Sequence, residues 1–153
     1  TPVRSDDIET GLLAEHLCER EIVVAMHQDN PLAQARSLAE LAHARWVHAT
    51  PSNGPGAVIE GLFAKAGLEP PTPVMVCESL LALPEIVRDT DLVTTLPEAL
   101  FQRVKDSHGL RQIQLSEPLP RLQIAILRME HVPLTPVAEE LLAWVRQAAR
   151  DVA

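Results

Sequence analysis

Small polar residues form a loop between two apolar segments near the middle of the chain. The segment Trp46 to His48 has bulky side chains that favour a strand, and the segment Val58 to Ala66 has the apolar spacing of a helix. A loop that runs from a strand into a helix start offers hydroxyl groups, free backbone N–H groups and the positive end of the helix dipole, which together suit a small anion. The alternative is an ordinary solvated connection. The candidate ligand residues of this loop are Thr50, Pro51, Ser52 and Asn53.

Other patterns that could support chemistry lack the spacing that the chemistry needs. The six histidines nowhere place two on one helical turn beside a carboxylate, so we expect them to be structural or exposed, and we expect no metal ion. The run Gly54 to Gly56 lacks the Lys-Ser or Lys-Thr pair of a phosphate-binding loop. Ser79 follows Glu78, but a serine before an apolar helical run is better explained as a helix cap. We therefore expect no catalytic residue and no cofactor.

The composition is that of an ordinary globular protein with an acidic balance. Of the 153 residues, 46% are hydrophobic and 22% are charged, and 13 Lys and Arg against 21 Asp and Glu give a net charge of −8. Because the basic residues are scattered, the chain by itself is expected to bind nucleic acid poorly. No apolar run is long enough to span a bilayer and the first residues do not resemble a signal peptide, so we expect a cytoplasmic protein without membrane contact. Cys18 and Cys77 are expected to be reduced.

Helices are expected to alternate with strands, which places the chain in the α/β class. Near-continuous apolar strands must be covered on both faces, so we expect a mixed sheet of five elements with helices on each side. Strands 45–48, 74–77 and 92–96 should be parallel neighbours. Ser79 is expected to cap a helix over 79–87, and Thr135 with Pro136 to begin the closing helix. The other expected elements are strands 22–26, 111–115 and 122–127, and helices 37–44, 58–66 and 97–104.

Several short motifs follow one another along most of the chain. They are REIVVAMHQDNPLA (20–33), LAELA (38–42), RWV (45–47), GLFAKAGLEPPTPVMVCES (61–79), DLVTTLPEAL (91–100) and LPRLQIAILRMEHVPLTPVAEELLAWVRQ (119–147). No single motif is diagnostic, but their order and separations are specific in combination. In this combination the chain resembles the effector-binding domain of LysR-type transcriptional regulators.

That resemblance implies a periplasmic-binding-protein-like fold of type 2, in which two Rossmann-like subdomains are joined by two crossover strands. The crossover strands would be Ile22 to His27 and Leu122 to Arg128. Residues 1–27 would be a remnant of subdomain I with the first crossover strand, 28–120 subdomain II, and 121–153 the second crossover strand with the closing helix. The family's DNA-binding winged helix-turn-helix and part of subdomain I are absent, so we expect an N-terminally truncated chain.

The resemblance also implies a function, that of a ligand-sensing regulatory domain. A small, anionic organic effector would bind in the cleft between the two subdomains, lined by the loop residues named above together with Ser79, Thr95 and Leu96. Homodimers or tetramers are implied, and DNA would be bound only through the absent domain. The closing helix has apolar residues on more than one face that need cover. We therefore expect that this chain either self-associates through the closing helix and the edges of the two crossover strands, or is accompanied by the missing segment as a separate piece. A solute-binding protein of a transport system has the same two-lobed architecture and is the alternative, with an enzyme of the Rossmann class third.

Overall fold

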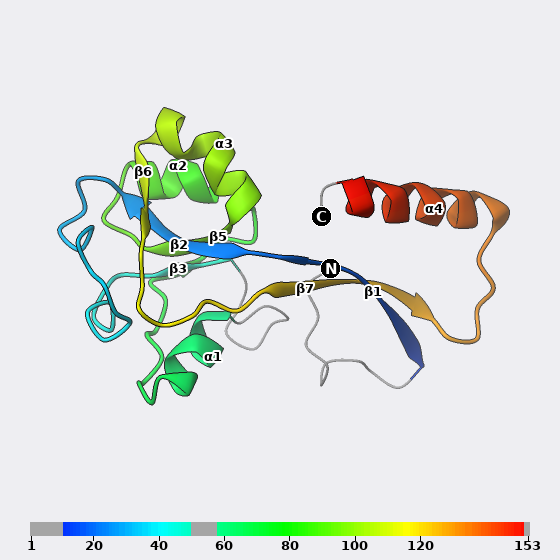
Figure 1. Cartoon of the computed structure of the whole chain (residues 1–153), viewed down its shortest axis with the longest axis horizontal. Coiled ribbons are helices and arrows are strands. Elements are labelled where there is room, and N and C mark those ends of the chain that lie inside the picture. Colours follow the sequence, from blue (N-terminus) through cyan, green and yellow to red (C-terminus); the bar gives the residue numbers. More distant parts are fainter. Residues whose placement is uncertain (1–10, 50–57, 152–153) are drawn as a thin grey trace. The chain divides into compact units, whose positions relative to one another are not determined.

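The structure is a computed structural model that describes residues 11–49 and 58–151 (Figure 1). Within these ranges helices and strands alternate along most of the chain, as the sequence predicts. No helix among the described residues is long and apolar enough to cross a membrane. The elements are β1 (Leu12–Arg20), β2 (Ile22–His27), β3 (Val47–His48), α1 (Val58–Lys65), β4 (Met75–Val76), α2 (Leu83–Arg88), β5 (Thr94–Pro97), α3 (Glu98–His108), β6 (Leu110–Ile113), β7 (Leu122–Met129) and α4 (Pro136–Asp151).

The chain divides into two compact units, which are described separately. Unit 1 contains residues 1–20 and 121–153, and unit 2 contains residues 21–120. The sequence grouped residues 21–27 with residues 1–20, but they lie in unit 2, because β2 forms antiparallel ladders with β5 and β6. The two segments expected to be crossover strands are both extended and form β2 and β7.

A mixed sheet of five strands is the centre of unit 2. Strand β2 lies between β5 and β6 and is antiparallel to both. Strands β3 and β4 are parallel, and a parallel bridge between Trp46 and Val93 joins β3 to the strand that continues as β5. The strand order is therefore β4, β3, β5, β2, β6. The predicted mixed sheet with three parallel neighbours is confirmed.

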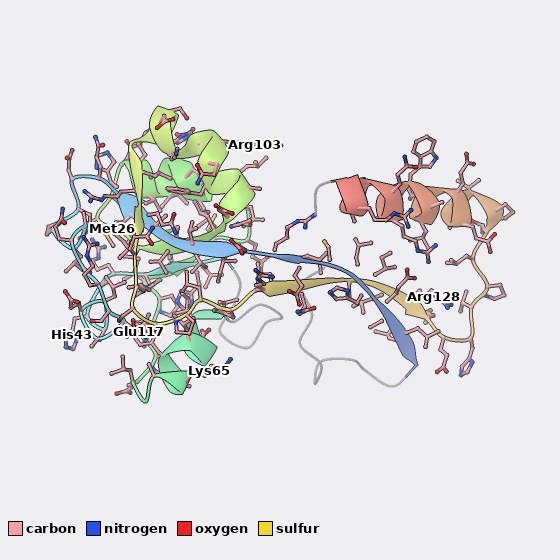
Figure 2. All side chains as sticks on the ribbon, viewed as in Figure 1. Met26, His43, Lys65, Arg103, Glu117 and Arg128 are labelled. Atoms are coloured by element: carbon pink, nitrogen blue, oxygen red, sulfur yellow. The ribbon has the colours of Figure 1, made fainter. Side chains whose placement is uncertain are left out.

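Both faces of this sheet are covered by helices, because successive side chains of a strand point to opposite faces. Val24 and Met26 of β2 pack in a cluster with Trp46 and with α1, whereas Val23 and Ala25 pack in a second cluster with α2 and α3. Figure 1 shows α2 and α3 on one side of the sheet and α1 on the other, and Met26 is labelled in Figure 2. Residues Ile22 to Met26 are all buried, which explains their continuous apolar sequence.

The expected helix over 37–44 is wrong. Residues 38–43 form successive turns, with hydrogen bonds of three-residue spacing such as Leu41 N to Leu38 O at 3.0 Å and Ala44 N to Leu41 O at 3.1 Å. The expected pairing of Ser37 with Glu40 is present, since the Ser37 hydroxyl donates to Glu40 Oε1 at 2.9 Å. The hydrogen bond between Ser37 and Glu40 that is typical of a helix N-terminus is thus present, but no α-helix follows it.

The expected helix over 79–87 begins later than predicted. Helix α2 starts at Leu83, its N-cap residue is Ala82, and no side chain caps it, so the predicted Ser79 cap is wrong. Pro84 lies in the first turn, where proline is favoured, and does not kink the helix. The preceding strand β4 is at the sheet edge and is exposed, with Met75 and Val76 at 41% and 42%, and Val74 just before it is 51% exposed.

Unit 1 consists of two antiparallel strands and the closing helix. Strands β1 and β7 pair from Leu12 with Met129 to Arg20 with Leu122, with a register shift between His16 and Cys18. Helix α4 packs on β1 and is tied to it by Arg146, which donates to both carboxylate oxygens of Glu15 at 2.7 and 2.6 Å. The predicted cap is confirmed, since Thr135 Oγ1 accepts from Ala138 N at 3.3 Å. Three large apolar side chains of the helix are exposed: Val137, Leu141 and Trp144.

Candidate functional site

Three neighbouring parallel strands of unit 2 end at the same edge of the sheet. The end of β3 is bonded to the end of β4, where Cys77 N donates to His48 O at 2.9 Å. On its other side β3 is bonded to the β5 segment, where Val47 N donates to Val93 O at 2.9 Å and Thr94 Oγ1 donates to Val47 O at 3.0 Å. In open α/β sheets, ligands bind at the carboxyl ends of the strands, so this edge is the candidate site.

The central loop of this edge lies outside the described residues. Thr50, Pro51, Ser52 and Asn53 therefore have no described position. Their two flanking elements are described: β3 ends at His48, and α1 begins at Val58. The loop that holds these residues consequently starts at the edge formed by the three strand ends.

Ser79 follows β4 at this edge and is exposed. Its carbonyl oxygen accepts hydrogen bonds from Ala82 N at 3.0 Å and Leu83 N at 3.2 Å, which form the turn before α2. The same carbonyl accepts a weak bond from Cys77 Sγ at 3.6 Å. The backbone of Ser79 thus shapes the turn, and its hydroxyl is not used as the helix cap.

Thr95 and Leu96 lie on β5, opposite Val24 and Val23 of β2. Thr95 is half-buried, whereas the side chain of Leu96 is fully buried among the residues that pack against α2 and α3. The strand runs directly into α3 after Pro97. One free N–H of the first turn of α3 is already used, because Glu98 N donates to Glu21 O at 2.9 Å.

The buried His48 and the half-buried Glu60, whose carboxylate oxygens are buried, form a polar pair that the sequence did not single out. His48 ends β3, Glu60 lies in the first turn of α1, and His48 Nδ1 is 3.4 Å from Glu60 Oε1. The His48 side chain is 4% exposed. His48 Nε2 and both carboxylate oxygens of Glu60 are buried without a hydrogen-bond partner among the described residues. Alternation with the buried Trp46 was a signal for the burial of His48, but nothing in the sequence pointed to Glu60 as its neighbour.

Burial lowers the pKa of His48 below its ordinary value, because the charged imidazolium loses contact with water. The nearby Glu60 carboxylate opposes this effect and is the smaller influence. His48 is therefore neutral at pH 7, and the proton of a neutral ring is favoured on Nδ1, which faces the carboxylate. The His48 ring also lies near the ring of Trp46, with the ring centroids 6.4 Å apart and the planes at 75°.

A metal centre is not supported by the described part of the chain. No group of three or more His, Cys, Asp or Glu side chains in residues 11–49 and 58–151 is placed to hold a metal ion. His48 and Glu60 form a group of two, and the ligand sets of structural and catalytic metal sites are larger.

Comparison with known proteins identifies the relatives of this chain. A family model described as LysR substrate binding domain matches residues 3–150. The chain is 24% identical over 152 residues to the HTH-type transcriptional regulator GalR of Pseudomonas putida, and the match covers 99% of this chain but 38% of that protein.

Solved structures show the same fold. The effector binding domain of QuiR in complex with shikimate superposes with a TM-score of 0.76 at 16% identity, covering 97% of this chain and 70% of that chain. The regulatory domain of CcmR from Synechocystis PCC6803, in complex with 2-PG, gives a TM-score of 0.76 at 12% identity and covers 97% and 71%. The fold is therefore that of LysR effector-binding domains, which is periplasmic-binding-protein-like of type 2.

Proposed function

This chain belongs to the LysR substrate binding domain family, and from that membership we propose that it is the ligand-sensing part of a LysR-type transcriptional regulator. The relative from P. putida is a transcriptional regulator of which the chain spans about 38%, which leaves room in such a protein for a separate DNA-binding domain. In this proposal DNA is bound by a winged helix-turn-helix domain outside these 153 residues, and the protein acts in the cytoplasm. No catalytic step is part of the proposal.

One observation in the structure supports ligand sensing most strongly. Strands β3, β4 and β5 are adjacent and parallel, so their carboxyl ends meet at one edge, from which the hydroxyl-rich loop begins. Two relatives of the same fold were solved with small molecules, shikimate and 2-PG. We infer that a small organic acid binds at this edge. The proposed contact residues are Thr50, Pro51, Ser52, Asn53, Ser79, Thr95 and Leu96.

Self-association is a further part of the proposal, and it is supported by α4. Leu141 and Trp144 on this helix are 62% and 65% exposed, and exposed apolar patches mark contact surfaces. We infer that this 153-residue chain self-associates through α4, and from the family membership we propose that the whole regulator is a homodimer or a tetramer. Light scattering of the 153-residue chain at micromolar concentration tests the first inference, because a chain that stays monomeric would contradict self-association through α4.

A ligand screen tests the proposed function. A ligand at 100 times its dissociation constant adds about 2.7 kcal/mol to the free energy of unfolding, so a panel of carboxylic and phosphorylated acids can be screened by thermal shift. We expect at least one acid to raise the unfolding temperature with a saturable dependence on its concentration. If no acid in a broad panel does so, the proposed function is wrong.

Ser79 provides a residue-level test of the same site. Ser79→Ala should weaken binding of the acid found in the screen by about 1 to 3 kcal/mol, because a hydrogen bond to a charged group is lost. Its effect on the stability of the free protein should be small, because Ser79 caps no helix. Ser107→Ala is the matched control, since that hydroxyl donates to Val104 O at 3.0 Å within α3, and it should leave binding unchanged. If wild type and Ser79→Ala bind the acid equally well in calorimetry, the Ser79 hydroxyl does not contact the acid and Ser79 serves only to form the turn before α2.

A further inference from the structure

The pair formed by His48 and Glu60 is not explained by the fold alone. A carboxylate buried in a protein is normally neutralised by a cation or satisfied by several hydrogen bonds. Among the described residues, His48 is the group of basic character that pairs with Glu60. The Nδ1–H group of His48 faces Glu60 Oε1 at 3.4 Å, which is longer than an ordinary hydrogen bond, so this contact is weak and leaves the carboxylate short of donors. The structure thus holds three unsatisfied polar atoms together: His48 Nε2, Glu60 Oε1 and Glu60 Oε2.

The three unsatisfied atoms are all hydrogen-bond acceptors. An ionised carboxylate only accepts hydrogen bonds. With the imidazole neutral and its proton on Nδ1 toward Glu60, Nε2 carries a lone pair and also accepts. All three unsatisfied atoms are therefore acceptors, in a place that carries the negative charge of Glu60. A group that fits here must donate hydrogen bonds, and a second anion would be repelled.

The position of the pair connects it with the candidate site. His48 is the last residue of β3, at the edge where the strands end, and its carbonyl oxygen accepts the hydrogen bond from Cys77 at the end of β4. Glu60 is in the first turn of the helix that follows the loop. Both residues belong to unit 2, so their proximity does not depend on the placement of the two units.

We propose that His48 and Glu60 form a subsite that binds a hydroxyl or ammonium group of the effector. This inference rests on the proposed function and makes it more specific. The effector is then not a plain organic acid but an acid that carries a hydrogen-bond donor away from its anionic group. The anionic group binds at the edge where β3, β4 and β5 end, and the acceptors of His48 and Glu60 select the donor. An acid that lacks the donor leaves these buried acceptors unpaired, which is the physical basis of strong discrimination at a polar pocket.

Matched pairs of acids test the subsite. Each pair contains a substituted acid and a plain acid of the same carbon framework: shikimate with cyclohex-1-ene-1-carboxylate, glycerate with propionate, and 3-aminopropionate with propionate. Binding to the 153-residue chain is measured by thermal shift and calorimetry for wild type and for Glu60→Gln, which keeps the size of the side chain but removes the negative charge. Glu69→Gln is the matched control, because Glu69 is exposed beyond the end of α1.

We expect the two acids of at least one pair to bind the wild-type chain with different affinities. A substituted acid should bind wild type about tenfold or more tightly than its plain partner. Glu60→Gln should remove most of this difference and leave the affinity of the plain acid nearly unchanged, and Glu69→Gln should alter neither. Because each affinity is a comparison of free and bound forms of one variant, a change in folding stability of Glu60→Gln does not imitate this result.

A second measurement separates binding from a purely structural pair. Nitrogen NMR of the His48 ring should show Nε2 without a proton, and its resonance should move when the substituted acid is added but not when the plain acid is added. Equal affinities within every pair, with binding still present, would overturn the subsite and leave the proposed function standing. The subsite would also be overturned if the affinity ratio between a substituted acid and its plain partner were the same in Glu60→Gln as in wild type. Absence of binding by every acid, in these pairs and in the broad panel, would refute the proposed function and the subsite together.

Discussion

Thr94 Oγ1 donates a hydrogen bond to the carbonyl oxygen of Val47 at 3.0 Å, and both residues are fully buried. This bond joins β3 to β5, which are otherwise connected by the parallel bridge between Trp46 and Val93. The two strands end at the candidate site, so the bond holds two of its three supporting strands in register. A side-chain hydroxyl here supplements a short stretch of backbone pairing.

Removal of this hydroxyl should lower the stability of unit 2. Thr94→Val keeps the shape of the side chain but leaves the buried Val47 carbonyl without this donor, so the free energy of unfolding should fall by about 1 to 2 kcal/mol. Thr95→Val is the matched control on the same strand, because Thr95 is half-buried, and it should change stability by less than about 0.5 kcal/mol. Urea unfolding of the free protein measures both. Equal effects of the two substitutions would show that the hydroxyl bond to Val47 contributes nothing specific.

Replacement by alanine should change the folding stability in opposite directions at two glycines. Gly109 ends α3 with φ +60°, and a Cβ there would come within 2.9 Å of His27 Nε2, so Gly109→Ala should cost about 1 to 2 kcal/mol or more. Gly61 lies inside α1 with open space around it, so Gly61→Ala should stabilise the protein by about 0.5 to 1 kcal/mol. Thermal unfolding of both variants checks the signs. A stabilised Gly109→Ala variant would contradict the left-handed cap.

Stability should depend on pH through His48. Its pKa is lowered in the folded protein, so between the folded pKa and the unfolded value of 6.5 the unfolded chain binds more protons. The stabilising contribution of the neutral ring is fully present above pH 6.5 and is lost as the pH falls through the folded pKa. Chemical unfolding measured from pH 7.5 down to pH 5 should therefore show a decline that is smaller in His48→Gln. In Glu60→Gln the folded pKa of His48 should fall further, because the carboxylate that raises it is gone. Identical pH profiles of wild type and His48→Gln would contradict the burial of a neutral ring.

The sheet of unit 2 could be predicted from the sequence because its strands contain nearly uninterrupted runs of apolar residues. Ile22 to Met26 are buried on both faces, and the parallel arrangement of β3, β4 and β5 follows from the helices between them. Thr135 and Pro136 likewise begin α4 as predicted, since a cap and a first-turn proline act within a few residues of one another.

The two failed helix predictions have different origins. Residues 38–43 form turns, and two backbone groups that a helix over 37–44 would leave free are bonded outside this segment: Leu41 O accepts from Trp46 Nε1 at 3.2 Å, and Leu38 N donates to Glu117 Oε1 at 3.1 Å from another part of unit 2 (Figure 2 labels Glu117). The local pattern does not show these partners. At α2, by contrast, a local signal was available: Pro84 favours a start at Leu83 over a cap at Ser79. The pairing of His48 with Glu60 arises only when α1 folds back onto β3, which no local pattern shows.

Amide NMR on the chain with the acid that gives the largest thermal shift tests the central claim most directly. If a small organic acid binds where the parallel strands end, the amide resonances of His48, Ala49, Cys77 and Thr95 should move in a saturable way. Those at the opposite ends of the same strands, Arg45, Val74 and Leu92, should stay in place. Perturbations gathered at those opposite ends, or along α4, would contradict the assignment of the effector site to this edge of the sheet.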